Sequence, residues 1–252
     1  ACYSRIELTN SIEEIKHPSI REVIKRYGNG KNLEVTHVGD LPAKSGIGSS
    51  SAFTIGLISS LSALNGQFLG RTRLAMEAVD LEQNVMNEKV GFQDQCASSF
   101  GGLVLIEADK QGIKPRKFIS RSEYIKYITS SLLLGFDGID RFSGIASKET
   151  IKFIAKKDNH NLLKELSEMS DQGIEFFGNE ADIKDHASLT KSIRDIKLIM
   201  NGDINNIRTN EIIEATESAG SLCTRIMGAG GGGFFVCWAP PERHEKIKQS
   251  VN

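Results

Sequence analysis

The sequence has few residues of the kinds that bind transition metals or form disulfide frameworks. Its 252 residues include four cysteines and five histidines, and both kinds are scattered along the chain. No Cys-x-x-Cys pair or Cys/His cluster has the spacing of a zinc site, and no histidine triad is indicated. We expect reduced cysteines in a cytoplasmic protein. The residues concerned are Cys2, Cys96, Cys223 and Cys237, with His17, His37, His160, His186 and His244.

An excess of charge and a long apolar segment are also missing. Lys plus Arg number 31 and Asp plus Glu number 32, so no net field favours nucleic acid or anionic lipid. The longest apolar runs, such as residues 232–239, are far shorter than the ~20 residues of a membrane-spanning helix. No signal-like segment opens the chain. We therefore expect small-molecule partners, with no nucleic acid and no membrane.

What the sequence does contain is a loop rich in glycine and serine. Residues 42–52 read Pro-Ala-Lys-Ser-Gly-Ile-Gly-Ser-Ser-Ser-Ala. The alternation in 33–38 predicts a half-buried strand before the loop, and apolar residues at helical spacing predict a helix after it. Glycine permits close approach of an anion, and a helix N-terminus favours negative charge. The loop is therefore a candidate phosphate site, although it is not a Walker A loop. A tight turn with a serine N-cap is the simpler alternative.

Two acidic residues further along the chain stand out by their positions in predicted helices. In the predicted helix 71–87, Glu82 lies roughly 70° from the centre of the apolar stripe, on the rim of the buried face. Asp94 opens a predicted short helix near 93–99. Taken alone, Glu82 is a solvated charge and Asp94 is an N-cap.

A second glycine-rich segment, residues 228–233, matches Gly-x-Gly-x-x-Gly but not its usual setting. A dinucleotide site needs a strand before the glycines and a helix after them. Here a predicted helix precedes the run and an apolar strand follows it. We therefore reject a dehydrogenase. A hinge without ligand contact remains the alternative to a loop at the active site.

The order of the predicted elements indicates an α+β protein with two lobes, residues 1–142 and 143–252. The first part mixes strands and helices, and the second is mostly helical before a returning strand. The expected strands are 1–8, 32–39, 102–108, 115–119, 130–136 and 233–239, with a turn at 112–115. The expected helices are 18–28, 50–64, 71–87, 93–99, several within 143–177, 182–201, 207–220 and one from residue 241.

These segments together resemble the GHMP kinase superfamily, which includes galactokinase and the homoserine, mevalonate and phosphomevalonate kinases. Residues 42–52 are similar to its second motif, Pro-x-x-x-Gly-Leu-Gly-Ser-Ser-x-Ala, with Ile47 in place of leucine. Residues 91–95 match the Gly-x-x-Asp-Gln segment, and residues 228–233 are similar to the third motif. The resemblance implies a ribosomal protein S5 domain 2-like N-terminal lobe and an α/β-plait-like C-terminal lobe.

The resemblance also implies a role for each matching residue. Asp94 would be the catalytic base beside the acceptor, and Glu82 would ligate Mg²⁺ together with Ser49 or Ser50. Arg141 would hold an anionic substrate by its planar fork, unless it pairs with Asp140 or Glu149 on the surface. The implied ATP-binding residues are Pro42, Ala43, Lys44, Ser45, Gly46, Ile47, Gly48, Ser49, Ser50 and Ser51, with Gly228, Gly230 and Gly231.

One subgroup is especially similar, the bacterial kinases that act on D-glycero-D-manno-heptose 7-phosphate at C1. Arg141 lies where that subgroup has Thr-Gly-x-x-Arg, but Asp137 replaces the threonine and adds negative charge. The resemblance implies ATP, Mg²⁺ and a sugar phosphate as ligands; a galactose, fucose or mevalonate type of acceptor and a non-catalytic sugar- or nucleotide-binding relative are the alternatives. The family's first motif, Arg-x-Pro-x-Arg-(Val/Ile), is missing, so we expect an N-terminally truncated chain. Further similar segments are residues 14–22, 41–53, 93–95, 100–102 and 230–234.

Overall fold

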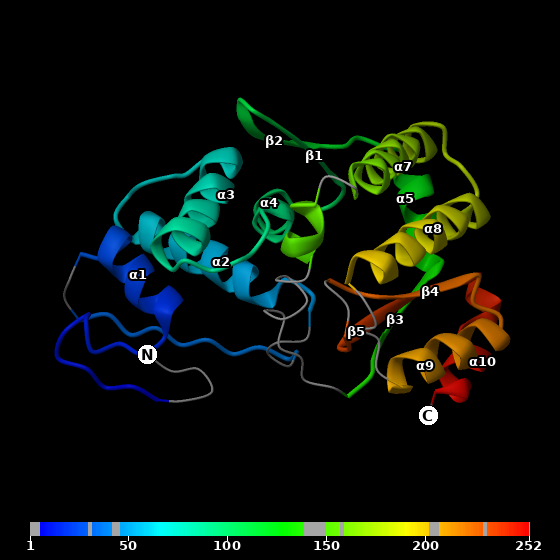
Figure 1. Ribbon diagram of the computed structural model, residues 1–252. Coiled ribbons are helices and arrows are strands. Elements are labelled where there is room, and N and C mark those ends of the chain that lie inside the picture. Colours follow the sequence, from blue (N-terminus) through cyan, green and yellow to red (C-terminus); the bar gives the residue numbers. More distant parts are fainter. Residues whose placement is uncertain are drawn as a thin grey trace. The chain divides into compact units, whose positions relative to one another are not determined.

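A computed structural model (Figure 1) describes residues 6–29, 32–41, 46–138, 150–156, 159–201, 207–228 and 231–251. The chain divides into two compact units, one of residues 1–43 and 48–119 and one of residues 44–47 and 120–252. The described residues combine helices with two small antiparallel sheets, which confirms the predicted α+β class. The lobe boundary at residue 142 stays a prediction.

The first unit has a helical core. Apolar side chains from three helices and from the turn that follows the third form one buried cluster. The predicted helices are confirmed: they are α1 (Pro18–Tyr27), α2 (Ser49–Leu64), α3 (Arg71–Asp80) and α4 (Gln93–Phe100). Helix α1 begins at a proline, which suits the first turn of a helix because its missing N–H group has no partner there.

The end of the predicted helix 71–87 is a π-helical turn, Leu81–Val85, rather than α-helix. The N–H group of Met86 donates to the carbonyl of Leu81 at 2.9 Å, so this turn holds one residue more than an α-turn. The wider turn rotates the side chains that follow. As a result Glu82 is only 1% exposed, whereas Val85 is 44% exposed. The prediction that Glu82 lies on the rim of the buried face is therefore wrong, and Val85, an apolar residue of the predicted helix, is the side chain that is exposed.

The predicted strand 32–39 is also wrong, although its burial pattern is right. Leu33 and Val35 are half-buried against the helical core, and Glu34 between them is exposed. A strand needs a continuous backbone ladder in addition, and alternation alone does not specify its partner. In the described residues 32–41 only Thr36 forms a β-bridge. Most of the predicted strand 1–8 lies outside the described residues.

Strands β1 (Val104–Asp109) and β2 (Gly112–Lys117) form an antiparallel hairpin. The turn lies at residues 110–111 and not at 112–115 as predicted, because the Asp109 carboxylate accepts hydrogen bonds from the N–H groups of Gln111 and Gly112. Such a side-chain bond to the following backbone fixes a tight turn. Pro115 lies within β2, where a two-stranded sheet tolerates a missing N–H donor.

The second unit is built on a three-stranded antiparallel sheet in the order β3–β5–β4. Its strands are β3 (Leu132–Phe136), β4 (Cys223–Ile226) and β5 (Phe234–Trp238). The structure confirms the predicted strands 130–136 and 233–239. The four-residue strand β4 is absent from the prediction, because it is too short to show a clear alternation of polar and apolar residues.

Helices cover both faces of this sheet (Figure 1). Cys223 and Trp238 pack against α5 (Ser122–Ser130) and α8 (Ile183–Asn201) on one face. Ile226 and Phe235 pack against α9 (Ile207–Ser218) and α10 (His244–Ser250) on the other. Helix α7 (His160–Gly178) packs on α8, and a 3-10 turn (Pro241–Arg243) precedes α10. The sequence predicted these helices except α5.

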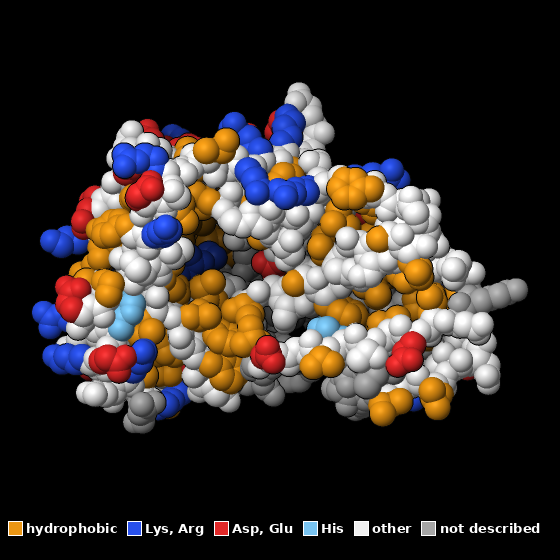
Figure 2. All heavy atoms as spheres, turned by 180° about the vertical axis from the view of Figure 1, so that it is seen from behind, with side chains coloured by type: hydrophobic (Ala, Val, Ile, Leu, Met, Phe, Trp, Pro, Cys, Tyr) orange, Lys and Arg blue, Asp and Glu red, His pale blue; other side chains and the backbone are white. Residues whose placement is uncertain are grey.

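The surface of the molecule carries charges of both signs, as the balanced composition requires. Figure 2 shows Lys and Arg together with Asp and Glu on one face, among apolar and uncharged polar side chains. Within the described ranges, no helix combines the length and the apolar character that crossing a membrane requires.

Candidate active site

The glycine- and serine-rich loop ends in a left-handed glycine that starts α2. Gly48 has φ 75° and ψ 16°, a conformation that residues with a side chain rarely adopt. Gly48 occupies the N-cap position and offers no side-chain bond, so the alternative of a serine N-cap is wrong. The N–H groups of Ser49, Ser50 and Ser51 stand in the first turn, where they have no acceptor within the helix. This end of α2 can therefore bind an anion.

The carboxyl group of Asp94 lies directly against Gly48. A Cβ atom built on Gly48 would lie 3.0 Å from Cγ of Asp94, so glycine is what allows this approach. Asp94 is exposed and belongs to the first turn of α4, whose N-cap residue is Phe92. The alternative role of Asp94 as an N-cap is therefore wrong. The fold instead brings an accessible carboxylate to the anion-binding end of another helix.

A buried hydrogen-bond network joins α2, the π-turn and α4. The Ser51 hydroxyl donates to Oε2 of Glu82 at 3.0 Å, and the Gln95 amide donates to the same oxygen at 2.5 Å. The sequence paired Glu82 with Ser49 or Ser50, but among the described contacts the serine that meets it is Ser51. Sequence reasoning also missed Gln95, although helical spacing on α4 and its place next to Asp94 could have indicated it.

The oxygen atoms around Glu82 fit a hard cation. Oε1 of Glu82 and Oε1 of Gln95 are buried and have no hydrogen-bond partner among the described residues. Carboxylate and amide oxygens are the ligand types that Mg²⁺ prefers, and Mg²⁺ commonly shares few protein ligands with substrate phosphates. The described part of the chain has no cluster of three or more His, Cys, Asp or Glu side chains with metal-binding geometry. A cation held by Glu82 would thus take further ligands from a bound nucleotide.

A second acid lies close to Glu82 and was missed by the sequence reasoning. Glu88 is half-buried, and its N–H group donates to the carbonyl of Glu82. Burial, and secondarily the negative charge of Glu82, raise the pKa of the Glu88 carboxyl. The smaller part of this shift comes from the negative charge of Glu82 nearby. A bound cation would relieve this repulsion.

In the second unit, the glycine-rich segment joins β4 to β5. The N–H group of Met227 donates to the carbonyl of Phe234 at 2.8 Å, which closes this hairpin. Gly228 and Gly231 have φ values of 64° and 85°. The element immediately before the glycines is thus strand β4 and not the predicted helix. A strand still follows the glycines, so the rejection of a Rossmann site stands.

Asp137 fixes the end of this glycine loop. Its carboxylate accepts a hydrogen bond from the N–H group of Gly233 at 2.9 Å, and its own N–H group donates to the carbonyl of Gly233 at 3.1 Å. The negative charge that Asp137 adds in place of the threonine is therefore stabilised by a hydrogen bond from the backbone of the loop. The other predicted site residues Pro42, Ala43, Lys44, Ser45, Arg141 and Gly230 lie outside the described residues.

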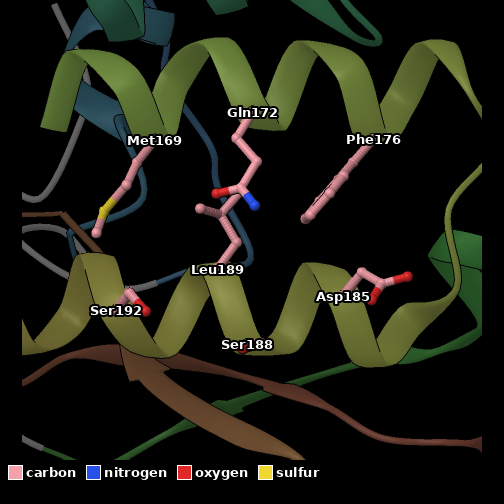
Figure 3. Close-up of a pocket in the computed structure, with 7 residues that line it drawn as sticks. All are labelled: Met169, Gln172, Phe176, Asp185, Ser188, Leu189 and Ser192. Atoms are coloured by element: carbon pink, nitrogen blue, oxygen red, sulfur yellow. The ribbon is translucent and has the colours of Figure 1, made fainter. Parts of the chain in front are cut away.

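A separate cavity of about 210 Å³ lies between α7 and α8 (Figure 3). Met169, Gln172 and Phe176 point into it from α7 toward α8. No predicted site residue lines it; the remaining lining residues are Asp185, Ser188, Leu189 and Ser192.

The loop and the two acids lie in a mixed α+β fold, and comparison with known proteins names the family to which this fold belongs. The GHMP kinases N-terminal domain matches residues 14–102, and the GHMP kinases C-terminal domain matches residues 151–252. Together these matches cover most of the chain. The chain therefore belongs to the GHMP kinase family.

Individual relatives are distant. The mevalonate kinase of Pyrococcus horikoshii is 25% identical over 240 residues, which cover 90% of this chain and 64% of the relative. The D-glycero-alpha-D-manno-heptose 7-phosphate kinase of Campylobacter jejuni is 26% identical over 226 residues, 84% of this chain and 62% of the relative. The chain thus spans less than two thirds of either protein.

A solved structure of similar fold is phosphomevalonate kinase of Streptococcus pneumoniae in complex with phosphomevalonate and AMPPNP. Its TM-score is 0.78 at 15% identity, with 98% of this chain and 81% of that chain covered. This likeness concerns the fold alone.

Proposed function

We propose that this protein is an ATP- and Mg²⁺-dependent kinase that phosphorylates a hydroxyl group of a sugar or sugar phosphate. One observation carries the proposal: the glycine-started N-terminus of α2 lies against the carboxylate of Asp94. Beneath the helix end, Ser51 and Gln95 hold the buried carboxylate of Glu82. Phosphoryl transfer needs these parts, a place for phosphates, a cation ligand and a proton acceptor.

In this proposal each part has one task. The loop 42–51 and the glycines at 228–231 bind ATP, and Glu82 with Ser49 or Ser50 holds Mg²⁺, which neutralises charge on the phosphate oxygens. Asp94 accepts the proton of the attacking hydroxyl. Because Asp94 is exposed beside Gly48, an acceptor can reach it from solvent.

The favoured acceptor is D-glycero-D-manno-heptose 7-phosphate, phosphorylated at C1. The sequence segments shared with heptose kinases support this choice, as does the relative from Campylobacter jejuni. A mevalonate type of acceptor is the second candidate, because the relative from Pyrococcus horikoshii is a mevalonate kinase. The free thiols of Cys96, Cys223 and Cys237 support a place in the reducing cytoplasm, where ATP is available.

A panel of acceptors tests the substrate. The full-length protein is assayed with ATP and Mg²⁺ against the heptose 7-phosphate, the unphosphorylated heptose, galactose, fucose, mevalonate and phosphomevalonate. The proposal expects the highest kcat/KM for the heptose 7-phosphate. A preference for mevalonate would keep the kinase and replace the acceptor, and ATP binding without turnover of any acceptor would favour the non-catalytic relative.

Asp94→Asn tests the catalytic base. Asparagine keeps the size of the side chain and removes the proton acceptor, so melting and ATP binding should stay near the wild-type values. Turnover should fall at least ~100-fold, as expected for loss of a general base. Asp171→Asn, an exposed substitution on α7, is the matched control and should keep full activity. Near-normal turnover of Asp94→Asn would show that Asp94 is not the catalytic base.

Glu82→Gln tests the cation ligand. Glutamine can still accept the bond from Ser51, so the fold should persist, but the amide binds a divalent cation more weakly than a carboxylate. We expect a higher Mg²⁺ concentration for half-maximal rate and a lower kcat. An unchanged rate, ATP affinity and Mg²⁺ dependence would remove Glu82 from the metal site.

A further inference from the structure

Two half-buried cations in the second unit, Lys197 and Arg225, lie close enough to interact electrostatically. Arg225 belongs to β4 and Lys197 to α8, and each is half-buried. Along β4 the side chains alternate between the two faces of the sheet. Thr224 and Ile226 face α9, as their contacts with Thr216 and Ile212 show. Cys223 and Arg225 therefore face α8.

Helix α8 brings Lys197 to the same place by its own periodicity. Thr190, Arg194 and Lys197 share one side of the helix, because residues three and four apart are neighbours on its surface. Thr190 accepts a hydrogen bond from the Trp238 indole at 3.0 Å, and Arg194 donates to the carbonyl of Thr224 at 2.7 Å. Successive turns of α8 thus meet successive positions of the sheet, and the next residue on this side, Lys197, lies within electrostatic reach of Arg225.

The two cations differ from the neighbouring Arg194 in their partners. Arg194 forms a salt bridge with Glu217 at 2.5 Å and a second with Asp195 at 3.5 Å. Within the described residues neither Lys197 nor Arg225 has a carboxylate within salt-bridge distance. Burial and the charge of Arg225 lower the pKa of Lys197 to about 8. Like charges held together at partial burial oppose folding, so an anion that binds between them would remove the repulsion.

The pair lies beside a partly exposed row of the sheet. Arg225 pairs with Val236 across the sheet, and Val236 pairs with Leu134. These three residues form a row on the α8 face, and Leu134 at its edge is 53% exposed. The row before it, which contains Cys223 and Trp238, is covered by α5 and α8. Beyond this row β4 leads to the glycine loop that begins at Gly228.

We propose that Lys197 and Arg225 bind the phosphate group that the acceptor already carries, beside the apolar row of the sheet. The inference rests on the proposed kinase function and specifies its substrate as a phosphate monoester rather than a neutral sugar. A guanidinium fork and an ammonium group suit a phosphate dianion, since the first fixes its orientation and the second adds charge. The phosphate of the acceptor and those of ATP share this chemistry, and the experiment separates them.

The first arm does not depend on kinase activity. Inorganic phosphate is titrated by calorimetry into the wild type, Lys197→Met, Arg225→Gln and the control Lys191→Met, whose exposed lysine lies on the same helix. We expect Lys197→Met and Arg225→Gln each to weaken binding at least ~10-fold, as loss of about 1.4 kcal/mol of binding does. Equal binding by all four proteins, or binding by none, would overturn the proposal. If Arg225→Gln does not fold, Arg225→Lys replaces it and should give a smaller loss.

The second arm assigns the phosphate by kinetics. We expect Lys197→Met to raise KM for the heptose 7-phosphate at least ~10-fold, with KM unchanged for ATP and for the unphosphorylated heptose. A raised KM for ATP instead would place the nucleotide at these cations and overturn the acceptor assignment. Phosphate binding that is lost in the variants, in a protein that phosphorylates no acceptor, would support the anion site and refute the kinase function.

Discussion

The paired cations Lys197 and Arg225 predict an unusual dependence of stability on pH. Folding lowers the pKa of Lys197 from its ordinary 10.5 to about 8, first because of burial and second because of Arg225. A tenfold change in proton affinity is worth about 1.4 kcal/mol, so the charged lysine costs the fold about 3 kcal/mol at pH 7. The replacement Lys197→Met removes this cost and keeps most of the apolar stem. We therefore expect the variant to be more stable than the wild type at pH 7.

The sign of the effect follows from proton binding. Between pH 8 and 10.5 the unfolded chain holds a proton on Lys197 that the folded protein has released, so the stability of the wild type rises with pH in this window. From pH 7 to pH 9.5 the gain should be about 2 kcal/mol. The other charged or titratable groups on α8 and β4 near this place are Arg194, paired with Glu217, Asp195 and Cys223, whose pKa burial raises to about 11.

Urea unfolding at pH 7 and pH 9.5 checks this prediction. The quantity of interest is the gain of the wild type minus the gain of Lys197→Met, which removes the contribution of all other titrating groups. Lys191→Met, on the exposed side of α8, is the control and should show the wild-type gain. A difference near zero, or a variant less stable than the wild type at pH 7, would refute the reasoning. Phosphate in the buffer must be avoided, because a bound anion would hide the effect.

Two further predictions concern glycines whose neighbours leave no room for a side chain. Gly48→Ala should lower the free energy of unfolding by about 1–2 kcal/mol, because alanine disfavours the left-handed backbone at this position. The variant should still fold, but its turnover should fall because the new Cβ displaces Asp94. Turnover equal to that of the wild type would contradict the contact. Gly135→Ala places a Cβ 2.2 Å from Cζ of Phe235, a buried residue of the sheet. It should lower the free energy of unfolding by about 1–3 kcal/mol, and an unchanged midpoint in urea unfolding would contradict the packing.

Local sequence determined the parts of the fold whose signals are local. Helix α2 after the glycine loop, helix α8 and strand β5 follow from apolar periodicity and flanking glycines, and the structure agrees within a residue or two. The family motifs are local as well, and they were enough to single out Asp94 and Glu82 as candidate site residues. Strand β4 and helix α5 were missed because short elements of mixed composition show no clear periodicity of apolar residues.

The environment of each site residue was decided by tertiary structure. Glu82 is buried because α2 and α4 pack over the π-turn, and its partners are Ser51 and Gln95 because these two helices present them to it. No spacing in the sequence reveals that Gly48 touches Asp94, since the contact depends on how α2 and α4 pack.

The cation pair shows the same division between sequence and tertiary structure. The sequence by itself gives the charge of Lys197 and Arg225, their residue types and their places in a helix and near a glycine loop. It does not reveal that a helix and a strand nearly thirty residues apart bring them within electrostatic reach of each other, with no ion-pair partner among the residues that the structure describes. Burial and proximity, which shift a pKa and make an anion site, are properties of the packed chain, because Coulomb energy depends on distance in space and on the solvent that packing excludes.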